Sequence, residues 1–410
     1  MEESLFYNII IVISLLVLVE LIIRTIVLFV NKKFQWLIIQ KDETPKLKPE
    51  GLKKFFEHGY DNELGWIRKP MTSHKEYGKE GETEWTINEK SARCNPTWDN
   101  KPSQISCYGD SFTFSRQVND DETWEHVLSN KIQSNVINFG VGNYGIDQAL
   151  LRLKKEFPKN ETNIVIMGVV PDTISRIVSV WKHYYEYGNT FGFKPRFIIQ
   201  NKKLELIKNF IDKEEKFYSY EKFLPEIKTY DYFYDKKFKQ EKISFPYTIN
   251  IFKNIRRNFS IIYWVLKIST KKTISDELKW KPMSIIMKIN LKWRIRLYKN
   301  NNINKLFEKI ILNFINYSKE RKFKPVLVFL PQKDDIKFIK NNYHFYKDFI
   351  KKIEELEDII VLDISKFLIN EKNLDEYYSD NNEYGGHYSK QGNEKIANYI
   401  EKRLVEKKLL

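Results

Sequence analysis

The chain has 410 residues and a formal net charge of +15, from 69 Lys and Arg against 54 Asp and Glu. Its 42% hydrophobic and 15% aromatic residues can bury enough apolar surface for folding, which excludes an intrinsically disordered protein. Two cysteines, Cys94 and Cys107, exclude a disulfide framework and a four-thiolate zinc site, and six histidines leave little room for a multi-histidine centre. We therefore expect neither a metal site nor a cofactor.

The first predicted element is a membrane-spanning helix. Residues 5–30 contain only two charged side chains, Glu20 and Arg24, and about 20 apolar residues are enough to cross the hydrocarbon core. These two side chains are four residues apart, so we expect them to pair on one helical face. A cleaved signal peptide would have a basic start, a shorter apolar run and small residues at its end. The sequence therefore favours a retained N-terminal transmembrane anchor over residues 1–33.

Charged residues on both sides of this helix bear on its orientation. Lysines follow the helix, whereas Glu2 and Glu3 precede it, and the positive-inside rule then favours a cytoplasmic body. Large domains are often translocated regardless of flanking charge, so the side of the membrane stays open.

An alternation of strands and helices follows. A polar linker is expected over 34–60, and Gly, Pro and short alternating runs predict a small β-rich extension with a hairpin over 61–100. The predicted strands are 105–108, 136–139, 164–170, 325–330 and 358–362, and the predicted helices are 121–132, 146–157, 303–320, 335–355 and 389–405. This pattern predicts an α/β fold with a parallel five-stranded sheet, whose core is contributed by 101–174 and 303–410.

A long segment, 175–302, interrupts the alternation and reads as a helical insertion between the third and fourth core strands. Within it, residues 251–300 contain 13 Lys and Arg against two acids, which gives +11 for this stretch alone. Basic residues mixed with Trp and Ile are typical of helices that lie on an anionic membrane surface. The alternative is a solvated helical subdomain whose aromatic side chains pack on the core. Nucleic-acid binding is not expected, because no nucleic-acid-binding module accompanies the charge.

Three polar segments follow predicted strands or precede the last helix. Ser111 comes directly after the first core strand, where a strand-to-helix turn can expose a hydroxyl beside backbone N–H groups. Gly142 lies after the second strand, where a glycine allows close backbone approach to a bound group. His387 lies after the last strand. The carboxyl ends of parallel strands share one edge of a sheet, so we expect the three residues to meet there.

These segments together resemble the SGNH/GDSL hydrolases. The matching blocks are YGDSFTF (108–114), NFGVGNYGIDQALL (138–151) and GGHYSKQGNEKIA (385–397), and DNELGWIRKP (61–70) looks like the N-terminal extension of membrane-linked members. The resemblance implies a flavodoxin-like three-layer α/β/α sandwich and serine-based ester hydrolysis or acyl transfer. It implies Ser111 as nucleophile, His387 as general base, and the amides of Ser111 and Gly142 as oxyanion donors.

The chain departs from the family pattern at two places. Asp172 stands after the third strand where the family usually has an Asn that donates to the oxyanion. Asp172 is then protonated, or another donor such as Asn143 replaces it, or the chemistry has changed. The family's Asp shortly before the histidine is also missing. Glu383 is the nearest substitute for orienting His387, with Asp380 or a backbone carbonyl as alternatives.

We interpret the chain as a membrane-anchored SGNH-type serine esterase or O-acyltransferase that acts on an acylated glycan or lipid. The alternative is a catalytically inactive SGNH-fold protein with a binding or assembly role at the membrane. The expected partners are the lipid bilayer and the acylated substrate, and no oligomeric state is predicted. The resemblance favours a place in the cell envelope, in contrast to the flanking charges.

Overall fold

A parallel sheet of five strands forms the centre of the protein, in a computed structural model that describes residues 2–271 and 273–410. The strands are β5 (Ser103–Gly109), β6 (Asn135–Asn138), β7 (Ile164–Val169), β10 (Lys324–Phe329) and β11 (Ile360–Asp363). Their spatial order is β11-β10-β7-β5-β6, which is the flavodoxin-like order. All five predicted strands are confirmed, because strands covered on both faces are apolar throughout and stand out in the sequence.

Helices cover both faces of the sheet and complete a three-layer α/β/α sandwich. One face packs against α4 (Ile146–Glu156), α13 (Asn301–Arg321) and α15 (Lys347–Glu354). The other packs against α3 (Trp124–Ile132), α16 (Ser365–Leu368) and α17 (Lys390–Glu406). The single helix predicted over 335–355 is instead two, α14 (Lys333–Asn341) and α15, separated by a short connection in which Phe345 and Tyr346 are buried in the core.

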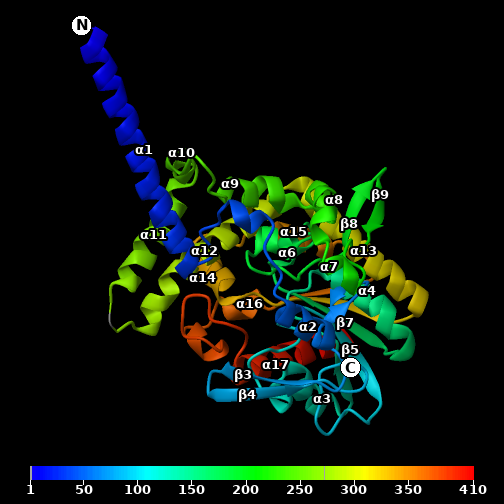
Figure 1. Ribbon diagram of the computed structural model, residues 1–410. Helices are drawn as coiled ribbons and strands as arrows, with labels where there is room; N and C mark the ends of the chain where they lie inside the picture. The colour runs from blue at the N-terminus through cyan, green and yellow to red at the C-terminus, as the bar shows by residue number, and fades with distance from the viewer. Residues whose placement is uncertain (1, 272) are drawn as a thin grey trace.

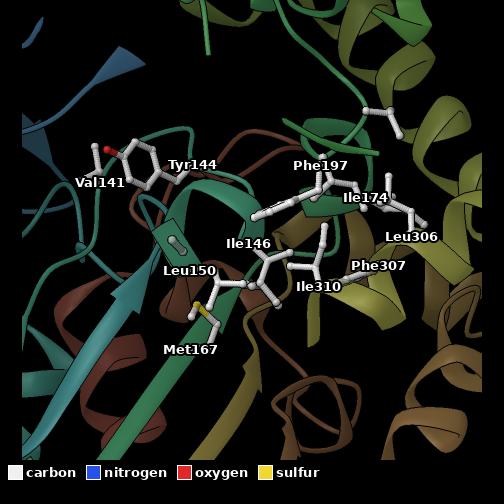
Figure 2. Close-up of a cluster of buried hydrophobic side chains, with 14 of the residues drawn as sticks. Val141, Tyr144, Ile146, Leu150, Met167, Ile174, Phe197, Leu306, Phe307 and Ile310 are labelled. Atoms are coloured by element: carbon white, nitrogen blue, oxygen red, sulfur yellow. The ribbon is translucent and has the colours of Figure 1, made fainter. Parts of the chain in front are cut away.

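The segment 175–302 shares the core of the sheet. Figure 2 shows Phe197 beside side chains of α4, β7 and α13 in one buried cluster. Phe197 belongs to an antiparallel hairpin, β8 (Arg196–Gln200) and β9 (Lys203–Ile207), in a segment expected to be helical. Its longer helices are α8 (Leu224–Tyr230), α10 (Tyr247–Phe252), α11 (Ile255–Ser269) and α12 (Asp276–Tyr298).

The N-terminal helix α1 (Glu2–Lys33) projects from the body, and by length and composition it could cross a membrane (Figure 1). Its second half packs on the body, where Val27 and Val30 are fully buried beside residues of α11. The Glu20 carboxylate accepts hydrogen bonds from the backbone N–H groups of Tyr247 (2.6 Å) and Thr248 (2.8 Å). Glu20 therefore caps α10, which replaces the ion pair expected along α1.

The segments between α1 and β5 surround one end of the sheet. Residues 34–60 pack against the body rather than forming a free linker. Leu37 and Ile38 are buried, and so is Leu52 in helix α2 (Pro49–His58). The expected β-rich extension contains the pair β1 (Tyr60–Asp61) and β2 (Gly65–Trp66) and the hairpin of β3 (Ser73–Gly78) and β4 (Gly81–Thr86).

Candidate active site

Ser111 lies in the turn that follows the carboxyl end of β5. In the sheet β5 is the neighbour of β7, and the strand order reverses between these two strands. Asp110 fixes this turn, because its carboxylate accepts hydrogen bonds from the N–H of Phe112 (2.8 Å) and of Val170 (3.0 Å), which follows β7. The Ser111 side chain is mostly enclosed, with the residue 7% exposed. The turn therefore holds the hydroxyl at the sheet edge and limits the directions from which it can be reached.

Gly142 faces Ser111 across a small open space. A β-carbon built on Gly142 would lie 4.0 Å from Ser111 Cβ and 3.9 Å from Arg68 Nη2. The Gly142 carbonyl accepts a hydrogen bond from Trp66 Nε1 (2.9 Å), which fixes the loop after β6. Asn143, the next residue, is exposed and has a φ of +68°, a left-handed conformation that asparagine tolerates. The glycine thus keeps the space in front of Ser111 free of a side chain.

His387 is held against the same turn by two contacts. Its ring lies on the ring of Phe112, with 4.8 Å between the centroids, and its Nδ1 lies 2.9 Å from Gln117 Oε1. Gln117 Nε2 donates to the carbonyl of Tyr77 (3.1 Å), which orients the amide so that its oxygen faces the histidine. Nδ1 is then the protonated nitrogen and Nε2 keeps a free lone pair. A free Nε2 is what a general base needs.

Gln117 is the residue that sequence reasoning missed. It lies in the turn that begins at Ser111, with a φ of +67°, and its oxygen also accepts from the His387 backbone N–H (2.9 Å) and Ser379 Oγ (2.8 Å). The turn therefore carries both the candidate nucleophile and the group that orients the base. An amide can take this place, as in proteases that use a Cys-His-Asn triad. Gln117 and His387 are 270 positions apart in the sequence, so no local pattern indicates their contact.

The prediction that Glu383 or Asp380 orients His387 is wrong. The Glu383 carboxylate is half exposed and lies 3.6 Å from Lys288 Nζ. Asp380 uses its backbone, donating to the Gly385 carbonyl (2.8 Å) and accepting from Lys333 Nζ (3.0 Å). Two consecutive glycines with positive φ, Gly385 and Gly386, turn the loop before His387, and among the described residues Gln117 rather than either acid accepts from the His387 ring.

Burial, together with nearby positive charges, keeps the imidazole of His387 neutral. Burial lowers the pKa of His387 well below its ordinary value, and the positive charges of Arg116 and Arg176 lower it further. A neutral imidazole can accept a proton over the whole neutral range and below it.

Asp172 is an ionised member of a buried network and cannot donate to an oxyanion. Its carboxylate accepts from Tyr185 OH (2.6 Å) and from Arg294 Nε (3.2 Å), and it lies 3.4 Å from Arg176 Nε. Burial would raise the pKa of Asp172, but the charges of Arg294 and Arg176 outweigh it, so the pKa lies below its usual value. The alternative of a protonated Asp172 is therefore wrong.

The structure thus brings Ser111, Gly142 and His387 together at one edge of the sheet, and Asn143 lies next to them with its side chain exposed to solvent. A serine hydroxyl, a neutral imidazole with a free nitrogen and an open space beside the serine are features that acyl transfer through a serine requires. Among the described residues, no group of His, Cys, Asp and Glu side chains is arranged to hold a metal ion.

Comparisons with known proteins give distant structural similarities. No protein-family model matches the chain, and no curated protein sequence matches it. Among solved structures, a lipolytic protein of the G-D-S-L family from Desulfitobacterium hafniense DCB-2 shares 12% identity at a TM-score of 0.35, covering 73% of this chain and 98% of that one. The acetyl xylan esterase AlAXEase shares 12% identity at a TM-score of 0.34, covering 73% and 99% of the two chains. The lipase/acylhydrolase from Enterococcus faecalis shares 12% identity at a TM-score of 0.31, covering 74% and 95%. At these values the function has to be argued from the residues of the site.

Proposed function

We propose that the protein is a serine-dependent ester hydrolase or O-acyltransferase that works beside a membrane on an acylated glycan or lipid. The observation that carries this proposal is the hydrogen bond from His387 Nδ1 to Gln117 Oε1, in the turn that begins at Ser111. This bond fixes the tautomer in which Nε2 carries no proton. The same ring packs against Phe112, the residue that follows Ser111.

The reaction follows the logic of serine catalysis. His387 Nε2 takes the proton of Ser111 Oγ as the oxygen attacks the ester carbonyl, and the imidazolium then gives that proton to the leaving alcohol. Water attacks the acyl-enzyme in a hydrolase, and a hydroxyl of an acceptor attacks it in a transferase. The amides of Ser111 and Gly142 stabilise the oxyanion, without the side-chain donor that an Asn at position 172 would supply.

The packing of α1 supports a retained membrane anchor. Residues 5–22 of α1 carry exposed apolar side chains over about 27 Å at 1.5 Å per residue, close to the hydrocarbon thickness of a bilayer. Beyond them, Val27 and Val30 belong to a core cluster with α11, and Glu20 caps α10. A cleaved signal sequence would not be expected to complete the core of the mature body.

A surface of α10 and α11 extends this contact with the bilayer. Phe252 and Phe259 join the two helices with 5.9 Å between ring centroids, and both are about half exposed. The surface begins where Glu20 of α1 meets α10, and Figure 1 shows α10 beside α1. Apolar side chains beside lysines and arginines fit an anionic lipid interface. This apolar stripe consists of Phe245, Ile249, Phe252, Ile255, Phe259 and Tyr263.

We expect a spin label on the apolar stripe to sit in lipid. The full-length protein would be reconstituted into vesicles with anionic lipid and labelled at Phe259→Cys in a Cys94→Ser background, with Val405→Cys on α17 as the exposed control. The label at 259 should be accessible to oxygen and shielded from a polar nickel reagent, and the label at 405 should show the reverse. If the nickel reagent reached the two labels equally, the apolar stripe would not be in contact with the membrane.

Reaction with a fluorophosphonate probe tests the proposed chemistry, because phosphonylation requires an accessible hydroxyl and a working base. We expect the full-length wild type to be labelled at Ser111 and to lose labelling in Ser111→Ala and His387→Ala. Ser389→Ala, at the N-cap of α17, is the matched serine control and should be labelled like wild type. A wild type that is not labelled while its fold is intact would favour the non-catalytic binding or assembly role.

A further inference from the structure

A cleft of about 560 Å³ opens beside Gly142 and is lined by basic side chains. They come from α2, from the segment before β3, from the turn after Ser111 and from α6 (Lys182–Tyr185). No carboxylate is present among the described residues that line it. The ionisable side chains of this lining are Lys54, His58, Arg68, Arg116 and Lys182.

Among the described residues Arg68 forms no ion pair, and the charge of Glu76 reaches it only at longer range. Arg116 is neutralised by an ion pair with Glu76, and Lys182 lies 3.0 Å from the Glu186 carboxylate. The guanidinium of Arg68 instead lies over the ring of Trp85, 4.3 Å from its centroid, with no carboxylate within 4.0 Å. A partly buried cation without a partner is costly, so a site of this kind favours an anion from outside the chain.

Arg68 stays charged at neutral pH and faces the reactive end of the cleft. Burial, followed by repulsion from Arg116, lowers the pKa of Arg68 to about 10, which is still above the neutral range. Its Nη2 and the Cβ of Ser111 flank the same open space in front of Gly142, each about 4 Å from the position of a β-carbon there. A negative group bound by Arg68 would therefore lie next to the ester that Ser111 attacks.

A second basic hollow of about 1010 Å³ adjoins the cleft. The two share Gly188, Thr190 and Phe191, and the second is lined by Lys32, Lys41, Lys46 and Lys48 with one acid, Asp42. Asp42 is turned inward, where it accepts a hydrogen bond from the Ile39 N–H (2.8 Å). The lysines and arginines along the two hollows suit an extended polyanion, because they concentrate positive charge along one surface.

We propose that this cleft binds the carboxylate or phosphate groups of an anionic acylated glycan, with Arg68 holding the negative group nearest the scissile ester. The statement that the bound group lies beside the scissile ester rests on the proposed serine chemistry. The binding of the anion itself does not depend on it. Arg68 is then the residue that selects charged over neutral substrates.

Binding is tested with the full-length Ser111→Ala protein, which cannot turn over. We expect it to bind a short oligogalacturonate with an affinity that falls as salt is raised, and to ignore a neutral oligosaccharide of the same length. Arg68→Gln should weaken binding by about 10- to 100-fold, the worth of a hydrogen bond between charged groups, while Arg68→Lys should lose less. Arg321→Gln is the matched control, since Arg321 also lies over an aromatic ring but far from the cleft. Equal affinity for the neutral oligosaccharide, or unchanged binding by Arg68→Gln, would overturn the inference.

Kinetics separate this role from a direct role on the oxyanion. For Arg68→Gln, kcat/KM should fall about 10- to 100-fold more for mono-4-nitrophenyl succinate, which carries a carboxylate, than for neutral 4-nitrophenyl acetate. An equal fall for both esters would place Arg68 on the oxyanion and contradict substrate selection. If the wild type hydrolyses neither ester but binds oligogalacturonate through Arg68, the proposed hydrolysis fails and the anion site stands.

Discussion

Replacement of Ser111 with alanine is expected to lower the rate of ester hydrolysis by about 10⁴- to 10⁶-fold, and His387→Ala should come close to that loss. The two groups act as one unit, so removing either ends the covalent route and leaves only the contribution of the backbone amides. The measurement is kcat for 4-nitrophenyl acetate with the purified full-length protein, with Ser389→Ala as the control. A Ser111→Ala protein that retains the wild-type rate would exclude Ser111 as nucleophile.

Gln117 gives the same unit a graded test. Gln117→Leu leaves Nδ1 of His387 without its acceptor, and we expect a loss of about 10- to 100-fold in kcat. Gln117→Glu keeps an acceptor but adds a negative charge, which stabilises the imidazolium and raises the pKa of His387. The acid limb of the kcat/KM profile, expected well below pH 6.5 in the wild type, should then move to higher pH. If the acid limb of the kcat/KM profile stays at the same pH in Gln117→Glu, Gln117 does not influence the pKa of His387.

The second large effect is expected at Arg294, which joins α12 of the insertion to the sheet. Its guanidinium lies 3.2 Å from Asp172 and 3.6 Å from Asp334, and it contacts Asp335 as well. All of these side chains are buried, so Arg294→Met would leave three carboxylates facing one another without that cation. We expect a loss of about 3–5 kcal/mol in the free energy of unfolding, the usual cost of removing one partner from a buried ionic cluster.

Denaturant unfolding of the full-length protein in detergent measures this loss. Arg296→Met, on the same helix but exposed, is the matched control and should change stability by less than about 0.5 kcal/mol. Burial already raises the pKa of Asp335 to about 7, above its value in the unfolded chain, so the folded state binds this proton more tightly. Protonation removes the unpaired charge, so the deficit of Arg294→Met should shrink as pH falls from 8 towards 5. A deficit independent of pH would point to lost packing instead.

The same network changes the expected effect of Asp172→Asn. On sequence alone, an asparagine at 172 would restore an oxyanion donor and raise the rate. In the structure the side chain of residue 172 is committed to Arg294, Arg176 and Tyr185, so an amide there would weaken an ionic cluster. Asp172 is therefore a structural residue at a position where the family resemblance implied a catalytic one.

The parts of the fold and site that sequence predicts are those with local signals. Fully buried strands are continuous apolar runs, and Ser111, Gly142 and His387 each follow a strand or precede a helix with recognisable neighbours. The hairpin β8–β9 was missed because its two strands are only five residues long and most of their side chains are half-buried or exposed, so the apolar alternation is weak. Gln117, Arg68 and Arg294 were missed because each acts through tertiary contacts, over sequence distances at which no periodicity connects the partners.

The burial of Val27 and Val30 has a consequence for how the protein is handled and turned over. Because the second half of α1 completes the cluster formed with α10 and α11, a chain shortened to begin at residue 34 would expose the apolar surface that α1 covers and would tend to aggregate. A proteolytic cut between α1 and α2 would likewise leave the two fragments associated. A single cleavage between α1 and α2 would therefore not release the body of the protein from helix α1.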